Sequence, residues 1–491
     1  MENEEKENLF YKYRSINALL HNFKELEEEY IYFAPAKDLN DPLEGYMDID
    51  FKGDKIIWRN FLKNYIFSLF IFRNIVILTK NDKELSSEDI HVAFNSRLKE
   101  EQYTEGKSYK ISCDEILKNK YVIFLIEYLS ERETSISKTE LYFYLLSLHF
   151  YILDIFNKIE IEKGGEIENK ALLYKRLDSY EEEQNDLINL LDSIKKIGVN
   201  GVKLLYILFQ YTNKNIESVL YAKILTSSNS SFIDKNYNLL ISFPKIYINK
   251  LDEIMYPRPY VTCFTKDFKD LSLWGYYSDS SKGACLIFKA IKKDNNYYLP
   301  IKKIKNYSTD ETIPVETNDF VNAEIKPVEY TKQKPAIPFF RSLGRLTLTI
   351  LQKHWYSEDG IISETVKDIF NKEGKNNWRK EYWEYITKNT NTKQENWKHE
   401  KEYRISLIST FDDEYDTVEK RKLKYKFDNL EGIIFGINTK ESDKIKVIKV
   451  LYDKCKKYNR KDFKVYQAIY DNQKGEISTI PINILKYIEN V

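Results

Sequence analysis

Cysteine and histidine are scarce in this chain of 491 residues, which has four cysteines and five histidines. No CxxC pair occurs among Cys113, Cys263, Cys285 and Cys455. Zinc ribbons and disulfide frameworks need closely spaced cysteines, so the sequence predicts neither of them. With so few histidines we also expect no multi-histidine metal site and predict no metal. A reduced, cytoplasmic setting fits this composition best.

An excess of charge is also missing, because Lys+Arg and Asp+Glu both number 76. A protein that coats nucleic acid needs a basic excess to gain from counterion release, so that function is not favoured. Long apolar runs are lacking as well. The two most apolar windows, residues 65–78 and 141–153, are shorter than the roughly 18–20 residues of a membrane span. We interpret them as buried core helices and expect no membrane partner.

The common sequence signatures of catalysis are absent. There is no GxGxxG, GxxxxGK[ST] or GxSxG pattern and no EF-hand loop, so the usual dinucleotide, phosphate, hydrolase and calcium motifs are not predicted. The segment His399–Tyr403 begins like HExxH but lacks the second histidine, which argues against a zinc protease.

Strand-like segments lie at both ends of the chain, for example at 30–34, 260–265 and 284–288, and helical patterns fill the middle. The sequence therefore predicts an α+β fold, in which both chain ends form a split, antiparallel-rich sheet core around a large all-helical insertion. The predicted parts are 1–57, the N-terminal part of the core; 58–251, the helical insertion; and 252–491, the C-terminal part of the core.

The stretch 397–408 concentrates charged and apolar residues in alternation. As a strand it would place apolar side chains on one face, and two carboxylates and a guanidinium on the other. The polar set is Glu400, Glu402, Arg404 and Ser406, and the apolar set is Tyr403, Ile405 and Leu407. The plain alternative is a half-buried strand with an exposed Glu402–Arg404 pair, which would add roughly 0–1 kcal/mol.

Several short motifs occur in a characteristic order. They are Tyr11–Arg14, Phe33–Pro35 with Asn40–Glu44, Cys263–Thr265, Leu273–Tyr277 with Gly283–Phe288, Lys393 and Trp397 with Glu400–Arg404, and Ile434–Gly436. Together they resemble the bacterial family catalogued as domain of unknown function 2971. The resemblance covers roughly residues 9–55 and 256–470, and it leaves out the helical middle.

The pattern of that family is in turn similar to ADP-ribosyltransferase-like folds, including toxins of phage defence. The resemblance implies an ADP-ribosyltransferase-like or NAD-degrading effector of bacterial antiviral defence, with NAD as its substrate. It implies that Glu402 and Glu400, as an E-x-E pair, are catalytic. The residues implied to contact NAD are Tyr13, Arg14, Asn40, Asp41, Trp274, Tyr276, Tyr277 and Arg404. The sequence departs from the pattern in lacking an H-Y-E triad and a Ser-Thr-Ser motif before the glutamate.

Plain roles are also open for these residues. The aromatic residues Trp274, Tyr276 and Tyr277 are equally consistent with core and rim packing, and Arg14 with an ordinary salt bridge. Two other functions stay open. One is a non-catalytic sensor or binding module, in which the helical insertion binds a protein partner. The other is a metal-dependent nuclease, in which Asp41, Glu44, Glu400 and Glu402 hold Mg²⁺. The acceptor, protein or nucleic acid, is not specified by the sequence.

Overall fold

The computed structural model divides into two compact units. It describes residues 8–79, 85–92, 107–163, 178–197, 207–215, 217–219, 222, 237–304, 316–334, 336–409 and 414–483. The sheet unit comprises residues 1–46, 257–335 and 387–491, and the helical unit comprises residues 47–256 and 336–386.

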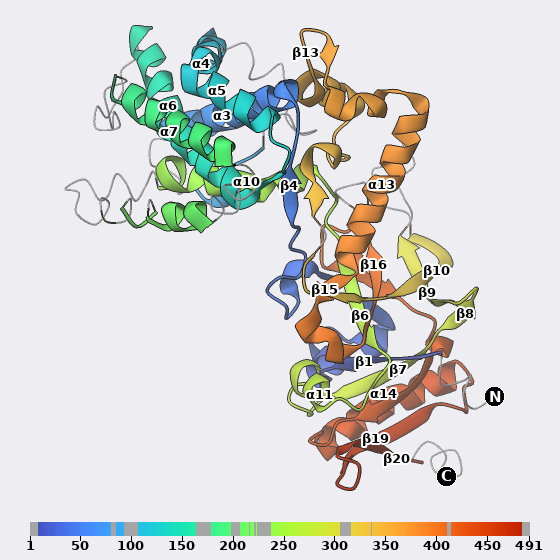
Figure 1. Ribbon diagram of the computed structural model, residues 1–491. Coiled ribbons are helices and arrows are strands. Elements are labelled where there is room, and N and C mark those ends of the chain that lie inside the picture. Colours follow the sequence, from blue (N-terminus) through green and yellow to red (C-terminus); the bar gives the residue numbers. More distant parts are fainter. Residues whose placement is uncertain are drawn as a thin grey trace. The chain divides into compact units, whose positions relative to one another are not determined.

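One large sheet, assembled from both ends of the chain, organises the sheet unit (Figure 1). Its order is β20 (Glu476–Pro481), β19 (Lys464–Asp471), β18 (Leu430–Phe435), β7 (Ala284–Lys289), β1 (Leu9–Arg14), β6 (Tyr260–Thr265), β16 (Glu402–Leu407), β10 (Glu316–Pro327), β9 (Asn296–Ile304) and β8 (Ile291–Lys293), and β3 (Ala34–Pro35) also pairs with β6. Neighbouring strands are antiparallel except for β18 and β19. This arrangement confirms the predicted α+β fold with a sheet built from both ends.

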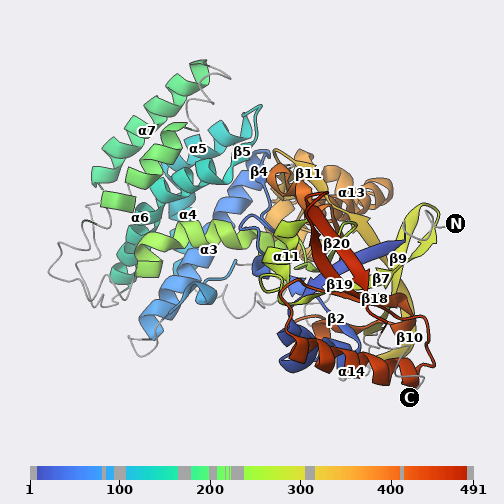
Figure 2. The same cartoon turned by 90° about the horizontal axis from the view of Figure 1, so that it is seen from below.

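Apolar residues alternate along the strands, and each set packs into a cluster of its own. On β7, Leu286 and Phe288 belong to the larger cluster, whereas Cys285 and Ile287 belong to the smaller one. Successive side chains of a strand point to opposite faces, so the two clusters lie on opposite faces of the sheet. Helix α14 (Glu441–Lys457) covers the first face (Figure 2), and helix α11 (Leu271–Tyr277) covers the second.

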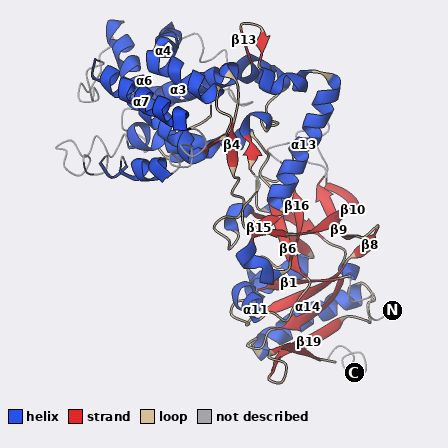
Figure 3. Ribbon diagram, in the orientation of Figure 1, coloured by secondary structure: helices blue, strands red, loops and turns tan. Residues whose placement is uncertain are grey.

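The helical unit contains most of the helices in the described part of the chain (Figure 3). Its longer helices are α3 (Lys55–Leu78), α4 (Lys107–Lys118), α5 (Lys120–Ser130), α6 (Lys138–Glu162), α7 (Asp178–Ile197), α10 (Phe243–Lys250) and most of α13 (Lys372–Thr390). Short polar side chains begin several of them. Asp54 accepts from the backbone N–H of Ile57 at the start of α3, and Ser137 accepts from that of Glu140 at the start of α6. The short strands β4 (Ile49–Phe51), β5 (Ile136–Ser137) and β12 (Ile337–Pro338) form a small sheet beside them.

The helical unit also takes in residues 336–386, which the sequence analysis assigned to the C-terminal part of the core. The predicted domain boundaries after residues 57 and 251 stay predictions. Helix α3 is long and apolar enough to cross a membrane, and no other helix among the described residues is. Just over half of its most apolar window, 56%, is buried within the protein.

Candidate active site

A cavity opens where strands β1 and β6 separate. Strand β1 pairs with β7 at every position from Leu9 to Arg14, but with β6 only at Tyr11, opposite Thr265. Beyond that point the two strands border a cavity of about 160 Å³. A cavity of about 150 Å³ holds one benzene molecule, so this space suits a single aromatic ring.

Residues of several strands line this cavity. Strand β1 contributes residues 11–14 and β6 contributes residues 261–265. The segment around β3 adds Tyr32, Ala34, Leu39 and Asn40, and helix α11 adds Leu273 and Tyr277. Three charged residues from the C-terminal part, Lys393, Glu400 and Glu402, complete the wall. The cavity therefore brings together the early, middle and late motifs of the chain.

Glu400 and Glu402 share one buried lysine. Lys393 lies in β15 (Thr392–Gln394), and its Nζ donates to Glu400 Oε2 at 2.6 Å and to Glu402 Oε2 at 3.0 Å. All three side chains are at most 5% exposed. A lysine ammonium therefore lies against both carboxylates and balances one of their two charges.

The two glutamates do not lie on one strand, and the prediction of a shared strand face is wrong for Glu400. Glu400 ends a 3₁₀ helix, η11 (Glu395–Glu400), and Lys401 follows in the left-handed conformation with φ 45°. This turn redirects the chain, so the strand begins only at Glu402. Both carboxylates nevertheless contact Lys393, one from each side of this turn.

Arg404 extends this group of charges into the interior. Its Nε donates to Glu402 Oε1 at 2.7 Å, and its two Nη atoms donate to the carboxylate of Glu44 at 2.7 and 2.8 Å. Nη1 also donates to the carbonyl of Thr390 at 2.6 Å. The Glu402–Arg404 pair predicted as a surface alternative is present, but Arg404 is only 1% exposed. We name Glu44, Lys393, Glu400, Glu402 and Arg404 the charge network.

The network drives the two glutamate pKa values apart. Burial alone would raise the pKa of Glu402, but the charges of Arg404 and Lys393 lower it to about 2. Burial raises the pKa of Glu400, and Lys393 offsets only part of that effect. At neutral pH Glu402 is therefore ionised, while Glu400 lies closer to protonation. A pair of carboxyl groups with separated pKa values is the usual arrangement of an acid–base site.

Helix α11 directs its three predicted aromatic residues to different places. Tyr277 lines the cavity and its hydroxyl donates to Glu400 Oε1 at 2.8 Å. Trp274 is buried; its Nε1 donates to the carbonyl of Phe268, and its ring meets that of Tyr13 edge-on. Tyr276 is 63% exposed and does not line the cavity. Trp274 and Tyr277 are three residues apart, so they lie on the same side of the helix, whereas Tyr276 turns away from that side.

The other predicted contacts to NAD divide in the same way. Tyr13 and Asn40 line the cavity. Arg14 lines it too, but its guanidinium makes a two-pronged ion pair with the buried carboxylate of Glu25. Asp41 is buried outside the cavity and accepts from the backbone N–H of Leu43, so it stabilises a turn. The salt-bridge alternative for Arg14 is therefore what the structure shows.

Sequence reasoning missed three residues of this region as site residues. Lys393 was only part of a motif, and nothing local indicates that it reaches both glutamates. Glu44 was considered only as a metal ligand. Lys12 was likewise only part of a motif, although its place two residues after Phe10 on a strand indicates that this lysine points toward the core.

The charge network does not resemble a cation site. Among the described residues, no group of three or more histidine, cysteine, aspartate or glutamate side chains could hold a metal ion. Lys393 itself contacts the two carboxylates that a divalent ion would need. Both carboxylates are therefore already paired with a cation of the protein.

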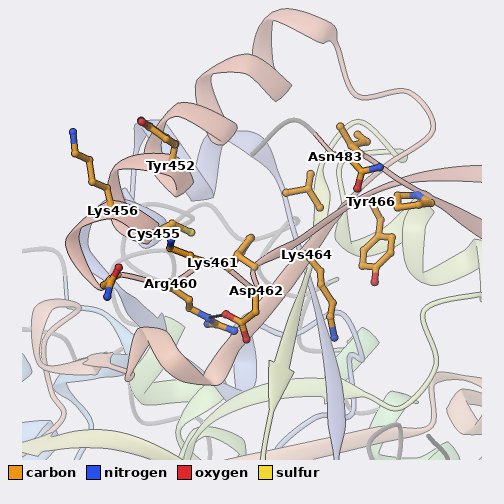
Figure 4. A pocket seen from close by; sticks show the side chains of 14 residues that line it. Tyr452, Cys455, Lys456, Arg460, Lys461, Asp462, Lys464, Tyr466 and Asn483 are labelled. Carbon is orange, nitrogen blue, oxygen red and sulfur yellow. Dashed lines mark hydrogen bonds and ion pairs between the residues drawn. The ribbon is translucent and has the colours of Figure 1, made fainter. Parts of the chain in front are cut away.

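A larger hollow of about 530 Å³ lies at the end of α14 and the start of β19 (Figure 4). Arg460, which lines it, forms ion pairs with Asp462 at 2.9 Å and Glu431 at 3.4 Å. None of the residues that the sequence implied for catalysis or NAD binding lines this hollow. The smaller cavity therefore remains the candidate active site.

Comparisons with known proteins found no match for this chain. The chain matches no family model, and no curated protein or solved structure is significantly similar to it. The resemblance to the family of domain of unknown function 2971 therefore rests on the quoted motifs alone.

Proposed function

We propose that the sheet unit cleaves the bond between nicotinamide and ribose in NAD, and passes ADP-ribose to an acceptor or to water. One observation carries the proposal. Two buried carboxylates with oppositely shifted pKa values meet on Lys393 in the wall of a cavity. The bacterial antiviral setting comes from the sequence resemblance only.

The two carboxylates suit the two tasks of this reaction. Loss of nicotinamide leaves an oxocarbenium-like ribose, and an ionised carboxylate beside it stabilises the positive charge. Glu402 fits this task because its neighbours keep it ionised. The acceptor must then lose a proton, which is the task of a base with a pKa nearer to neutrality. Glu400 fits this second task because burial raises its pKa.

The size of the cavity suits one part of NAD. A space of about 160 Å³ can hold the nicotinamide ring but not the whole dinucleotide. Tyr13 and Tyr277 are among the residues of its wall, and aromatic rings pack well against a flat heterocycle. In this arrangement the adenylate half of NAD lies outside the cavity.

The test is release of nicotinamide from NAD, measured by chromatography, with wild-type protein and Glu402→Gln. The matched control is Glu431→Gln, because Glu431 is also a buried, ion-paired glutamate but lies on β18, away from the cavity. All three proteins are assayed well below their unfolding temperatures, with folding checked by circular dichroism. We expect Glu402→Gln to lose at least about a hundredfold in rate, and Glu431→Gln to keep it.

Release by Glu402→Gln at the wild-type rate would contradict the proposal. If wild-type protein released no nicotinamide with protein, nucleic-acid or water as acceptor, the alternative of a non-catalytic binding module would be favoured.

A further inference from the structure

Lys12 is a buried lysine at the candidate active site that the proposed reaction does not use. It lies in β1, is 8% exposed and lines the cavity between β1 and β6. Its Nζ donates to Thr262 Oγ1 at 2.6 Å and to the carbonyl of Cys263 at 3.2 Å. Both acceptors belong to β6, so Lys12 bridges the two strands where they separate.

No carboxylate forms an ion pair with Lys12 among the described residues. The charged and titratable groups that act on it are Arg14 on its own strand, Cys263 on β6 and Glu402 on β16. Phe264 adds a ring 5.2 Å from Nζ. Burial, with the charge of Arg14, lowers the pKa of Lys12 to about 7, although Cys263 and Glu402 oppose this effect. A large fraction of Lys12 is therefore neutral at physiological pH.

The two hydrogen bonds match the neutral amine. An ammonium has three N–H donors, whereas a neutral amine has two donors and one lone pair. Thr262 and the carbonyl of Cys263 accept two hydrogens. The third position of Nζ has no hydrogen-bond acceptor or ion-pair partner in the described part of the chain. In the neutral form that position is a lone pair, which makes Nζ a nucleophile.

We propose that Lys12 is a covalent binding site for a small aromatic aldehyde, which enters the cavity between β1 and β6 and forms a Schiff base with Nζ. The Nζ lone pair forms a bond to the carbonyl carbon. The carbonyl oxygen then leaves as water with the two hydrogens of the amine, and nothing is oxidised or reduced. A cavity of about 160 Å³ limits the ligand to one ring. The reaction does not depend on NAD cleavage.

The test treats the full-length protein with benzaldehyde and sodium cyanoborohydride at pH 7, and maps the reduced adduct by peptide mass spectrometry. At this pH a lysine of pKa about 7 has about a thousand times more neutral amine than an ordinary one. Burial of Lys12 limits the access of benzaldehyde, so the difference in labelling rate should be smaller than the difference in neutral amine. We expect Lys12 to be labelled at least about tenfold faster than the exposed Lys282. The Lys12→Arg protein should lose this rapid phase, and the Lys282→Arg control should keep it.

Labelling of Lys282 and other exposed lysines as fast as Lys12 in wild-type protein would overturn the proposal, without reliance on any variant. So would an unchanged rapid phase in Lys12→Arg. The measurement contains no NAD. An absence of nicotinamide release therefore has no bearing on it, and the two proposals can fail separately.

Discussion

In the charge network, the partners of each side chain offset the free-energy cost of burying its charge. Moving ions out of water costs several kcal/mol each, and the cost is offset only when every charge has good partners. Here each oxygen of Glu400 and Glu402 accepts a hydrogen bond, from Lys393, Tyr277 or Arg404. The network is therefore satisfied within the protein, and each partner matters to the others.

The two glutamates should differ in what they contribute to stability. At pH 7 we expect Glu402→Gln to lower the free energy of unfolding by about 3 kcal/mol, because it leaves buried cations less well compensated. In this variant Arg404 still pairs with Glu44, and Lys393 still pairs with Glu400. The expected loss in the free energy of unfolding is therefore at the low end of the usual range. Glu400→Gln should cost less than about 1 kcal/mol, since burial already disfavours its charge.

Denaturant unfolding followed by circular dichroism measures both values. Equal losses for the two variants would show that the glutamates share their charge evenly, contrary to the opposite shifts of their pKa values.

At the level of elements, the separation of β1 from β6 creates the cavity, and close packing on the other side of β1 holds that strand in place. Gly283 precedes β7 and lies against the end of β1. A Cβ at Gly283 would lie 2.2 Å from the carbonyl oxygen of Arg14 and 2.9 Å from that of Ser278. Backbone atoms cannot move aside as a flexible side chain can, so only glycine fits at this position.

We therefore expect Gly283→Ala to destabilise the protein by about 1–3 kcal/mol, the usual cost of overpacking. The matched control is Gly275→Ala, eight residues earlier, where a Cβ meets nothing within 4 Å. Gly275 lies inside α11, and alanine favours helix over glycine by about 1 kcal/mol, so the control should be neutral or stabilising. Thermal unfolding measures both. A similar fall in Tm for the two variants would contradict the close contact at Gly283.

The strands could be predicted well from the sequence, and the site only in part. Segments 260–265 and 284–288 were predicted as strands, and the structure has them as β6 and β7 almost residue for residue. Both segments are rich in β-branched and aromatic residues, which favour a strand without help from distant parts of the chain. Glu400 and Glu402 were identified as a pair, but their meeting on Lys393 depends on the left-handed turn at Lys401 and on the packing of β15. Such long-range contacts leave no periodic signal.

At the scale of the whole molecule, each unit contains a buried group with a strongly lowered pKa, which makes the unit sensitive to acid. In the helical unit, His149 is fully buried; it contacts Tyr65 Oη at 3.0 Å through Nδ1 and the carbonyl of Leu239 at 2.8 Å through Nε2. Burial lowers the pKa of His149 to about 4. In the sheet unit, Glu402 has a pKa of about 2. The two groups respond to different ranges of pH.

The sign of each effect follows from linkage. His149 is neutral in the folded protein. Its contribution to the free energy of unfolding is therefore complete above about pH 6.5, the pKa of histidine in the unfolded chain, and is lost as the pH falls to about 4. Glu402 is ionised in the folded protein. Its contribution to the free energy of unfolding is therefore complete above about pH 4.3, the pKa of glutamate in the unfolded chain, and is lost as the pH falls to about 2. Each amounts to roughly 3 kcal/mol. Asp154, whose pKa burial raises to about 6, and Glu400 act in the opposite sense.

We therefore expect the stability difference between wild type and His149→Gln to shrink between about pH 6.5 and 4, and that between wild type and Glu402→Gln only between about pH 4.3 and 2. The effect of Asp154 is common to both proteins of a pair and cancels in each difference. The effect of Glu400 cancels only in the His149 pair, because the charge of Glu402 helps to raise the pKa of Glu400 and Glu402→Gln removes that charge. Hydrogen exchange, corrected for the intrinsic rate at each pH, measures the first difference on peptides of α6 and the second on peptides of β16. If both differences shrink over the same pH range, His149 and Glu402 do not govern the acid response of their own units.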